Sequence, residues 1–399
     1  MSETQLSARV NELEESQTIG MAKLCRELAE KGFDVINLSL GEPDFDTPAH
    51  IRDAAKKAID EGYTHYPPVA GFSELRKVIS EKFRRENNLE YAPSQIVVST
   101  GAKQAIANAV LSLVNKGEEV VIPMPYWVSY IEIVKLAEGK TVFIPTTMEN
   151  DFKISPEQLE KAITKKTRMF MFSSPCNPTG SVYTKEELAA LAKVFEKHEG
   201  VYILSDEIYE HINYNGKHES IAQFPSINER VIVVNGVSKS FAMTGWRIGY
   251  IGASLKIAQA CDKMQGQFTS GASSVSQKAA EAALANGLSS TREMRDAFLR
   301  RRNLMLSLLR AIPNIKVNKP SGAFYLFPDV SFYLGKSDSE KKIDNVNDLC
   351  MYLLYKAHVS TVPGTAFGEE KCIRISYSAS DEMIQKAVER IHSALTALK

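Results

Sequence analysis

Residues 231–250 read VIVVNGVSKSFAMTGWRIGY. Two runs of apolar and β-branched residues, 231–234 and 247–250, enclose a polar segment that contains Lys239. Short apolar runs of this kind are typical of buried strands, and polar residues that directly follow a strand lie at the sheet edge where ligands bind. The stretch therefore predicts two successive strands, with functional residues in the segment that follows the first.

Similar apolar runs alternate with helix-like segments from about residue 95 to residue 260. The further runs cover residues 96–98, 119–122, 141–144, 169–172 and 201–204. The segments between them, such as 104–114, 127–137 and 185–197, have the period of an amphipathic helix. This alternation indicates an α/β fold in which helices sandwich a mostly parallel, seven-stranded sheet.

The character of the sequence changes near residue 290. A long Arg-rich helix is predicted over 291–309, followed by strand-like runs at 321–326 and 372–376 with helical segments between and after them. We therefore expect three parts. These are an N-terminal segment, 1–45, that packs with the small domain, a large domain, 46–290, and a small α+β C-terminal domain, 291–399.

The composition excludes several classes of protein. The chain has 399 residues, with 48 Lys+Arg against 48 Asp+Glu, so it lacks the basic excess that is usual in nucleic-acid and membrane-surface binders. Its five scattered cysteines form no CxxC pair, which argues against a disulfide framework or a zinc ribbon. No signal-peptide pattern and no membrane-spanning apolar run is present. These features predict a cytoplasmic protein without a metal.

Polar segments follow the apolar runs, at residues 99–103, 173–180, 205–209 and 235–239. They would bring Lys239, Asp206, Asn177, Tyr209 and a glycine-containing helix start to one rim of the sheet. Each feature alone has an ordinary alternative, such as a solvated lysine, a helix-capping aspartate or a plain turn. Pyridoxal 5′-phosphate, however, needs all of them together: a lysine amine, an acidic partner for its pyridine nitrogen, a phosphate cup and donors to its phenolic oxygen.

The run Gly236–Gly249 resembles, position for position, the pyridoxal-phosphate attachment signature of class I aminotransferases. The resemblance extends over nearly the whole chain, through the segments 41–45, 66–71, 125–130, 177–180, 205–209 and 322–325. It implies the fold of type I pyridoxal-phosphate-dependent transferases and a homodimer with shared active sites.

The resemblance also implies roles at the cofactor ring. Lys239 would hold the cofactor as a Schiff base and later move a proton between the substrate Cα and the cofactor C4′. Asp206 would keep the pyridine nitrogen protonated, and Asn177 and Tyr209 would bond the phenolic oxygen. Trp127 would stack on the ring.

Further positions would bind the phosphate and the substrate. The phosphate would be held by backbone N–H groups of Gly101, Ala102 and Lys103, by the side chains of Ser238 and Arg247, and by Tyr66 of the neighbouring subunit. Arg374 would take the substrate α-carboxylate, helped by Gly41. Trp127 and Asn177 would also contact the substrate.

Substrate choice depends mainly on Lys103. The segment 101–105 resembles the Gly-Gly-Lys-Gln segment of bacterial-type aspartate aminotransferases, in which this lysine meets the distal carboxylate. Ser16 and Thr18 resemble the segment of the same subgroup that closes over the substrate. The resemblance implies transfer of the amino group of L-aspartate to 2-oxoglutarate by a ping-pong cycle. The alternative for Lys103 is that it points to solvent, and the alternative activity is aromatic or broad-range transamination, prephenate included.

Two residues depart from the family pattern. Glu14 stands where prephenate-transaminating members tend to carry a basic residue, and Cys176 replaces the commoner Asn before Asn177. We expect the replacement by cysteine to have no effect on function.

Two rival functions fit less well. A pyridoxal-phosphate-sensing regulator would need a basic DNA-binding domain, and a nicotinamide dehydrogenase would carry GxGxxG after its first strand.

Overall fold

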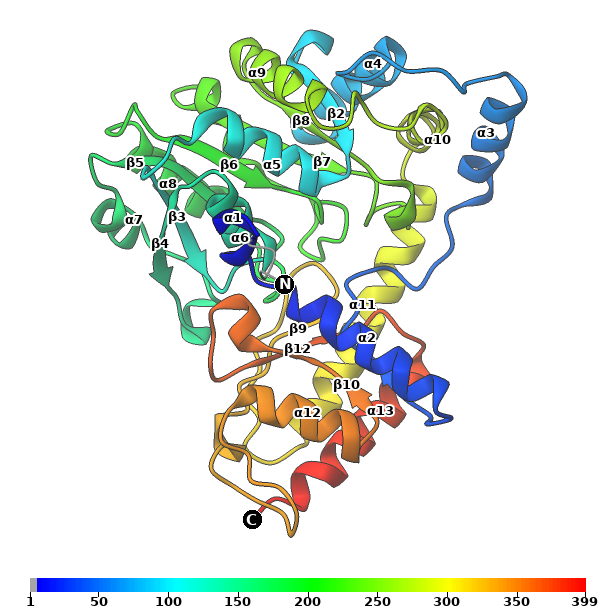
Figure 1. The fold of residues 1–399 in the computed structure, drawn as a ribbon, viewed down its shortest axis with the longest axis vertical. Helices are drawn as coiled ribbons and strands as arrows, with labels where there is room; N and C mark the ends of the chain where they lie inside the picture. The colour runs from blue at the N-terminus through cyan, green and yellow to red at the C-terminus, as the bar shows by residue number, and fades with distance from the viewer. Residues whose placement is uncertain (1–5) are drawn as a thin grey trace, which may run out of the picture.

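A seven-stranded sheet forms the centre of the structure, a computed structural model that describes residues 6–399 (Figure 1). Residues 1–5 of the predicted N-terminal segment lie outside the described residues. The strand order is β2-β8-β7-β6-β5-β3-β4. β8 runs antiparallel to both of its neighbours, and every other pair is parallel. The predicted mostly parallel sheet is therefore confirmed. Its strands are β2 (Ile96–Thr100), β3 (Glu119–Met124), β4 (Lys140–Pro145), β5 (Thr167–Ser173), β6 (Tyr202–Asp206), β7 (Val231–Gly236) and β8 (Ile248–Gly252).

Helices cover both faces of this sheet, because successive strand residues point to opposite sides. In β7, Val231 and Val233 pack into one buried cluster while Ile232 and Val234 pack into another. The first cluster includes residues of α3 (Ala49–Asp60), α4 (Ser73–Lys82), α7 (Pro156–Ala162), α8 (Lys185–Phe195) and α10 (Ser274–Ala285). The second includes residues of α5 (Ala102–Leu113), α6 (Ser129–Leu136) and α9 (Leu255–Gly266). Burial on both faces explains the continuous apolar runs in the sequence.

A third cluster joins the two ends of the chain. β1 (Ile36–Asn37) pairs in parallel with β10 (Val359–Ser360), and an antiparallel sheet has the order β11-β12-β9. This part of the molecule lies below the large sheet in Figure 1, and the long helix α11 reaches from one part to the other. The domain boundaries at 45 and 290 stay a prediction. The remaining elements are α1 (Ala8–Asn11), α2 (Gln17–Glu30), α11 (Ser289–Arg310), β9 (Tyr325–Leu326), α12 (Val346–Lys356), β11 (Val362–Pro363), β12 (Ile373–Ser376) and α13 (Asp381–Thr396).

The strand expected over 321–326 is shorter than predicted. Only Tyr325 and Leu326 form β9. Ala323 has a left-handed backbone (φ 55°), and a Cβ on Gly322 would lie 2.6 Å from the Cβ of Pro175. Residues 322–323 pack too closely against the loop after β5 to keep regular strand geometry. Within residues 6–399, no helix has both the length and the apolar character that crossing a membrane requires.

A buried ion pair holds the turn that follows β6. Lys82, at the end of α4, is fully buried and pairs with Glu210. Asn87 completes the contact, since it accepts from the Lys82 amine (2.8 Å) and donates to the second Glu210 oxygen (2.7 Å). Burial would raise the pKa of Glu210, but Lys82 and its other partners lower it well below the ordinary value. Both charges are thus matched within the protein.

We predict that Lys82→Met strongly destabilises the fold, because it leaves the buried Glu210 carboxylate without its lysine partner. Urea unfolding at pH 7 should show a loss of about 3–5 kcal/mol. The control is Lys56→Met, which removes an exposed pair with Asp53 (side chains 73% and 66% exposed) and should cost less than about 1 kcal/mol.

The pH dependence provides a second measurement on Lys82→Met. A carboxyl with a lowered pKa stabilises the fold above its unfolded pKa of about 4, and this stabilisation is lost as the pH falls. The difference in the free energy of unfolding between wild type and Lys82→Met should therefore become smaller at acidic pH. A constant difference down to the acid transition would contradict this account.

Candidate active site

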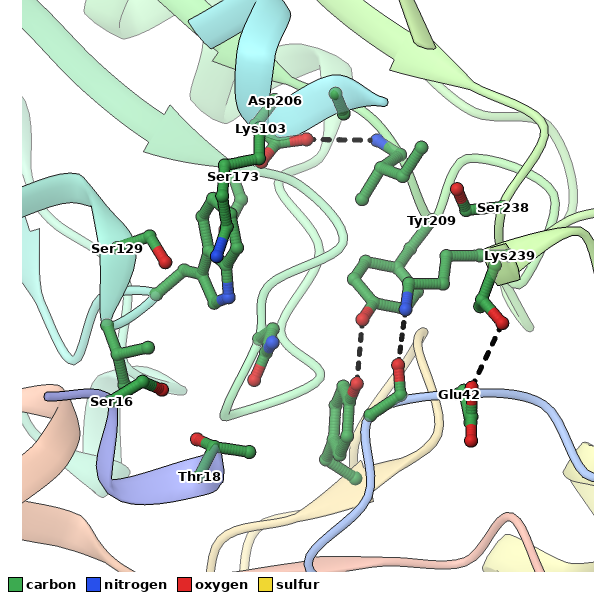
Figure 2. Close-up of a pocket in the computed structure, with 18 of the residues that line it drawn as sticks. Ser16, Thr18, Glu42, Lys103, Ser129, Ser173, Asp206, Tyr209, Ser238 and Lys239 are labelled. Carbon is green, nitrogen blue, oxygen red and sulfur yellow. Dashed lines mark hydrogen bonds between the residues drawn. The ribbon is translucent and has the colours of Figure 1, made fainter. Parts of the chain in front are cut away.

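A cavity of about 340 Å³ opens beside the carboxyl ends of the central strands, which is within the usual size range for small-molecule sites. Figure 2 shows Ser16, Lys103 and Ser129 on one side of it, with Tyr209, Ser238 and Lys239 opposite. All but two of the site residues expected from the sequence line the cavity; the exceptions are Gly101 and Tyr66. The lining members are Ser16, Thr18, Gly41, Ala102, Lys103, Trp127, Asn177, Asp206, Tyr209, Ser238, Lys239, Arg247 and Arg374.

Lys239 lies in the turn after β7, where its side chain crosses the cavity. Its amine donates to the backbone oxygen of Gly41 and lies 5.7 Å from the centre of the Tyr209 ring. Burial lowers the pKa of Lys239 to about 8, with Arg374 and Arg247 acting in the same direction and Glu42 opposing them. The amine is thus close to the neutral, nucleophilic form near physiological pH.

Asp206 is the last residue of β6, and its side chain is buried at the base of the cavity. The Tyr130 hydroxyl donates to one carboxylate oxygen (2.8 Å) and the Ile208 N–H to the other (3.2 Å). Burial raises the pKa of Asp206 to about 6, although both hydrogen bonds lower it. Among the described residues, no basic side chain forms a salt bridge with it. The carboxylate is therefore suited to a positively charged nitrogen of a ligand.

The N-terminus of α5 and Arg247 together form a site for an anion. No side chain of residues 6–399 caps this helix, and its first residues, Ala102 and Lys103, line the cavity. Its first N–H groups and its dipole are therefore available to an anion there. Gly101 has a left-handed backbone (φ +83°), and a Cβ there would lie 2.4 Å from Nη2 of Arg247. The Gly101 N–H itself donates to the Ser99 oxygen (2.8 Å). The expected donation of this N–H to a phosphate stays a prediction, and the glycine also leaves the space that Arg247 occupies.

Arg374, on β12, is a buried cation without an acidic partner. Only 2% of the residue is exposed. Its guanidinium donates to Oδ1 of Asn177 (3.0 Å) and to the backbone oxygen of Ser39 (2.6 Å), while Nε has no partner within residues 6–399. Among the described residues, no carboxylate lies within salt-bridge distance of it. A buried, unmatched guanidinium that lines a cavity favours an anionic ligand.

Lys103 is the cation on the far side of the cavity from Lys239. Its amine lies 5.2 Å from the centre of the Trp127 ring, over the cavity wall, and the side chain remains exposed. Desolvation and the charge of Arg247 lower the pKa of Lys103. Ser16 and Thr18, at the start of α2, line the same cavity, and the Thr18 hydroxyl has no hydrogen-bond partner in the part of the chain that the structure describes. Polar groups around Lys103 are thus available to a ligand.

Tyr66 lies away from the cavity and is 93% exposed. Sequence reasoning missed other residues that touch the site. Tyr130 supports Asp206, Ser39 accepts from Arg374, and the Tyr325 hydroxyl lies 2.7 Å from that of Tyr209. Tyr130 and Tyr325 occur in the quoted segments 125–130 and 322–325, but only the folded chain shows what their hydroxyl groups contact.

Gly101→Ala should impair the anion site. The new Cβ would displace Arg247, and the left-handed backbone would cost about 1–2 kcal/mol. We expect a lower melting temperature and a smaller rise in that temperature when inorganic phosphate is added to protein freed of bound small molecules. The matched control is Gly245→Ala, where a Cβ meets nothing within 4 Å. An undiminished response to phosphate in Gly101→Ala would contradict the assignment.

Known proteins resemble this chain in both sequence and fold. A family profile described as Aminotransferase class I and II matches residues 33–391. A Petunia hybrida protein called bifunctional aspartate aminotransferase and glutamate/aspartate-prephenate aminotransferase is 48% identical over 99% of this chain and 83% of its own. An aspartate aminotransferase of Pinus pinaster is 46% identical over 99% of this chain and 81% of its own. The crystal structure of the Rhizobium meliloti aspartate aminotransferase superimposes with a TM-score of 0.95 at 42% identity, covering 99% of this chain and 100% of that one.

Proposed function

The chain belongs to the class I and II aminotransferases, and on this basis we propose that it transfers the amino group of L-aspartate to 2-oxoglutarate. The products would be oxaloacetate and L-glutamate. The observation that carries this proposal is the buried Arg374 guanidinium, which has no carboxylate partner among the described residues and lines the same cavity as the Lys239 amine. An amino acid has both groups that such a site requires, a carboxylate and an amine.

The residues of the cavity fit pyridoxal 5′-phosphate. A Cβ at Gly101 would occupy the place of Arg247, so the glycine leaves room for a guanidinium next to the uncapped end of α5, where a phosphate would be held. Ser238 lines the same region. Asp206 would pair with the pyridine nitrogen, and Tyr209 and Asn177 would bond the phenolic oxygen. Trp127 would cover the ring. When bound, the cofactor supplies an electron-accepting ring that stabilises negative charge at the substrate Cα.

The protein groups around the reacting atoms have separate tasks. Lys239 would hold the cofactor covalently and, once released by the substrate amine, would move a proton between the substrate Cα and the cofactor C4′. Its lowered pKa favours the neutral form that accepts this proton. Arg374 would bind the α-carboxylate, with the Gly41 backbone beside it. These contacts would fix the Cα next to the Lys239 amine.

Lys103 supports a dicarboxylic substrate. A substrate with its α-carboxylate at Arg374 could place a second carboxylate near the Lys103 amine, with Ser16 and Thr18 close by. The name of the Petunia relative favours prephenate as a further substrate. Glu14 donates its N–H to Glu132 (3.0 Å) next to this region and carries a negative charge. Because prephenate-transaminating members tend to carry a basic residue at the position of Glu14, aspartate remains our principal proposal.

The first test is the visible absorbance of the protein loaded with pyridoxal 5′-phosphate. L-Aspartate alone should remove the visible band, because the amino group stays on the enzyme until a keto acid takes it up. Addition of 2-oxoglutarate should restore the band. If another amino acid removes the band and aspartate does not, the cofactor assignment stands and the substrate assignment is wrong.

Lys103→Ala then tests the distal carboxylate. We expect kcat/KM for aspartate to fall at least about tenfold relative to kcat/KM for phenylalanine, which is the size expected for the loss of a charged hydrogen bond. Lys116→Ala, at an exposed lysine paired with Glu138, should change neither value. Equal losses for both substrates would place Lys103 with the cofactor instead.

We further propose a cytoplasmic homodimer in which Tyr66 reaches the partner's phosphate. The exposed ring of Tyr66 and the exposed Phe268 (65%) support a covered surface here, and the five free cysteines suit a reducing compartment. Light scattering should give twice the chain mass. Tyr66→Phe should weaken cofactor binding without dissociating the dimer. A monomer with full activity would contradict this proposal.

A further inference from the structure

Tyr325 is a fully buried tyrosine at the meeting point of the cofactor side and the substrate side of the cavity. It lies on β9 directly opposite Ser376 of β12, in antiparallel register. Arg374 is two residues from Ser376 on the same strand, so its side chain and that of Tyr325 lie on the same face of the small sheet. The fold thus fixes the position of the tyrosine ring relative to the guanidinium.

Three contacts define the surroundings of Tyr325. Its hydroxyl lies 2.7 Å from the Tyr209 hydroxyl. The Arg374 guanidinium carbon lies 4.6 Å from the centre of its ring. A Cβ on Gly41 would lie only 2.9 Å from the Tyr325 hydroxyl oxygen. Gly41 is also the residue whose carbonyl accepts from Lys239. The tyrosine therefore touches groups from both halves of the site.

We propose that Tyr325 is a positioning residue with two separable actions: its hydroxyl turns the Tyr209 proton toward the cofactor, and its ring holds the Arg374 guanidinium for the substrate carboxylate. This inference rests on the proposed function and adds a residue to which the family resemblance gave no role.

The hydroxyl pair explains the first action. Two hydroxyl groups that share one hydrogen bond retain one proton for another acceptor. Within residues 6–399, the Tyr209 hydroxyl is the only hydrogen-bond partner of the Tyr325 hydroxyl, and the Tyr209 hydroxyl has no other partner. Burial raises the pKa of both groups, so both keep their protons at neutral pH. When Tyr325 donates to Tyr209, the Tyr209 proton is left for the phenolic oxygen of the cofactor.

The aromatic ring explains the second action. The Arg374 guanidinium lies between Tyr325 and Phe367, at 4.6 and 5.1 Å from the two ring centres. A ring face attracts a guanidinium without neutralising its charge. A carboxylate in the same place would bind Arg374 more strongly but would compete with the substrate. Two rings therefore orient the cation and leave its charge for the ligand.

The test uses the protein loaded with pyridoxal 5′-phosphate and two variants that separate the actions. Tyr325→Phe removes the hydroxyl and keeps the ring, while Tyr325→Leu removes both. The first measurement is the pH midpoint of the visible band, and the second is the dissociation constant for succinate, a dicarboxylate without an amino group. The matched control is Tyr377→Phe, because Tyr377 is also fully buried and its hydroxyl donates to the Ala323 oxygen outside the cavity.

We expect the midpoint to rise by about half a pH unit in Tyr325→Phe. A donor at the phenolic oxygen stabilises the form that has lost its proton, so a less well oriented Tyr209 raises the pH at which the proton leaves. Succinate affinity should stay within about twofold of wild type. In Tyr325→Leu the midpoint should rise similarly and succinate should bind about fivefold to twentyfold more weakly. Tyr377→Phe should change neither value.

The outcomes distinguish this inference from the proposed function. An unchanged midpoint in Tyr325→Phe overturns the role of the hydroxyl, and unchanged succinate binding in Tyr325→Leu overturns the role of the ring. If Tyr325→Leu does not fold, Tyr325→Met takes its place, because methionine fills an irregular space well. Failure of wild type to show a visible band that responds to an amino acid would instead contradict the proposed function itself.

Discussion

The site depends on one constraint, the burial of charged side chains that have no salt-bridge partner in the described part of the chain. Arg374 and Asp206 are both almost fully buried, and among the described residues neither forms a salt bridge. Such burial costs free energy unless a ligand completes the missing contacts. The pair of Lys82 and Glu210 is the contrast, since it is equally buried but matched on both sides. The charged side chains that stabilise the fold are thus paired with each other, whereas those that line the cavity are free to bind a charged ligand.

The paired charges of Lys82 and Glu210 help to fix the position of Asp206. Glu210 follows Asp206 by four residues, so the pair with Lys82 fixes the turn that presents Asp206 and Tyr209. His211 continues this contact, because one of its ring nitrogens lies 2.8 Å from Glu86 and the other 2.9 Å from the hydroxyl of Ser240. Ser240 directly follows Lys239. One largely buried network therefore supports the chain next to both the lysine and the aspartate.

Much of the fold could be predicted from the sequence, because strands buried on both faces leave continuous apolar runs. The polar residues after those runs indicated where the cavity lies, because ligands bind at the carboxyl ends of parallel strands. The support of the site could not be predicted in this way. Tyr130 and Asp206 are 76 positions apart, Tyr209 and Tyr325 are 116 apart, and Lys82 and Glu210 are 128 apart. Such pairs arise from tertiary packing and leave no local pattern. The bond from the Gly101 N–H to the Ser99 backbone oxygen is likewise invisible in the sequence, because it depends on the turn geometry.

The polar contacts across the cavity are of a kind that a ligand can replace. Arg374 uses two neutral oxygens, from Asn177 and Ser39, and Lys239 uses the backbone oxygen of Gly41. A carboxylate is a stronger hydrogen-bond acceptor for a guanidinium than a neutral oxygen. The contact of an amino-acid carboxylate with Arg374 is therefore stronger than the contacts with Asn177 and Ser39 that it replaces. Ser39, Gly41 and Arg374 come from the two ends of the chain, while Asn177 and Lys239 come from loops of the large sheet. A ligand in the cavity therefore replaces contacts between the two ends of the chain and the loops of the large sheet. The same substrate that pairs with the buried charges can thus also change the distance between these two parts.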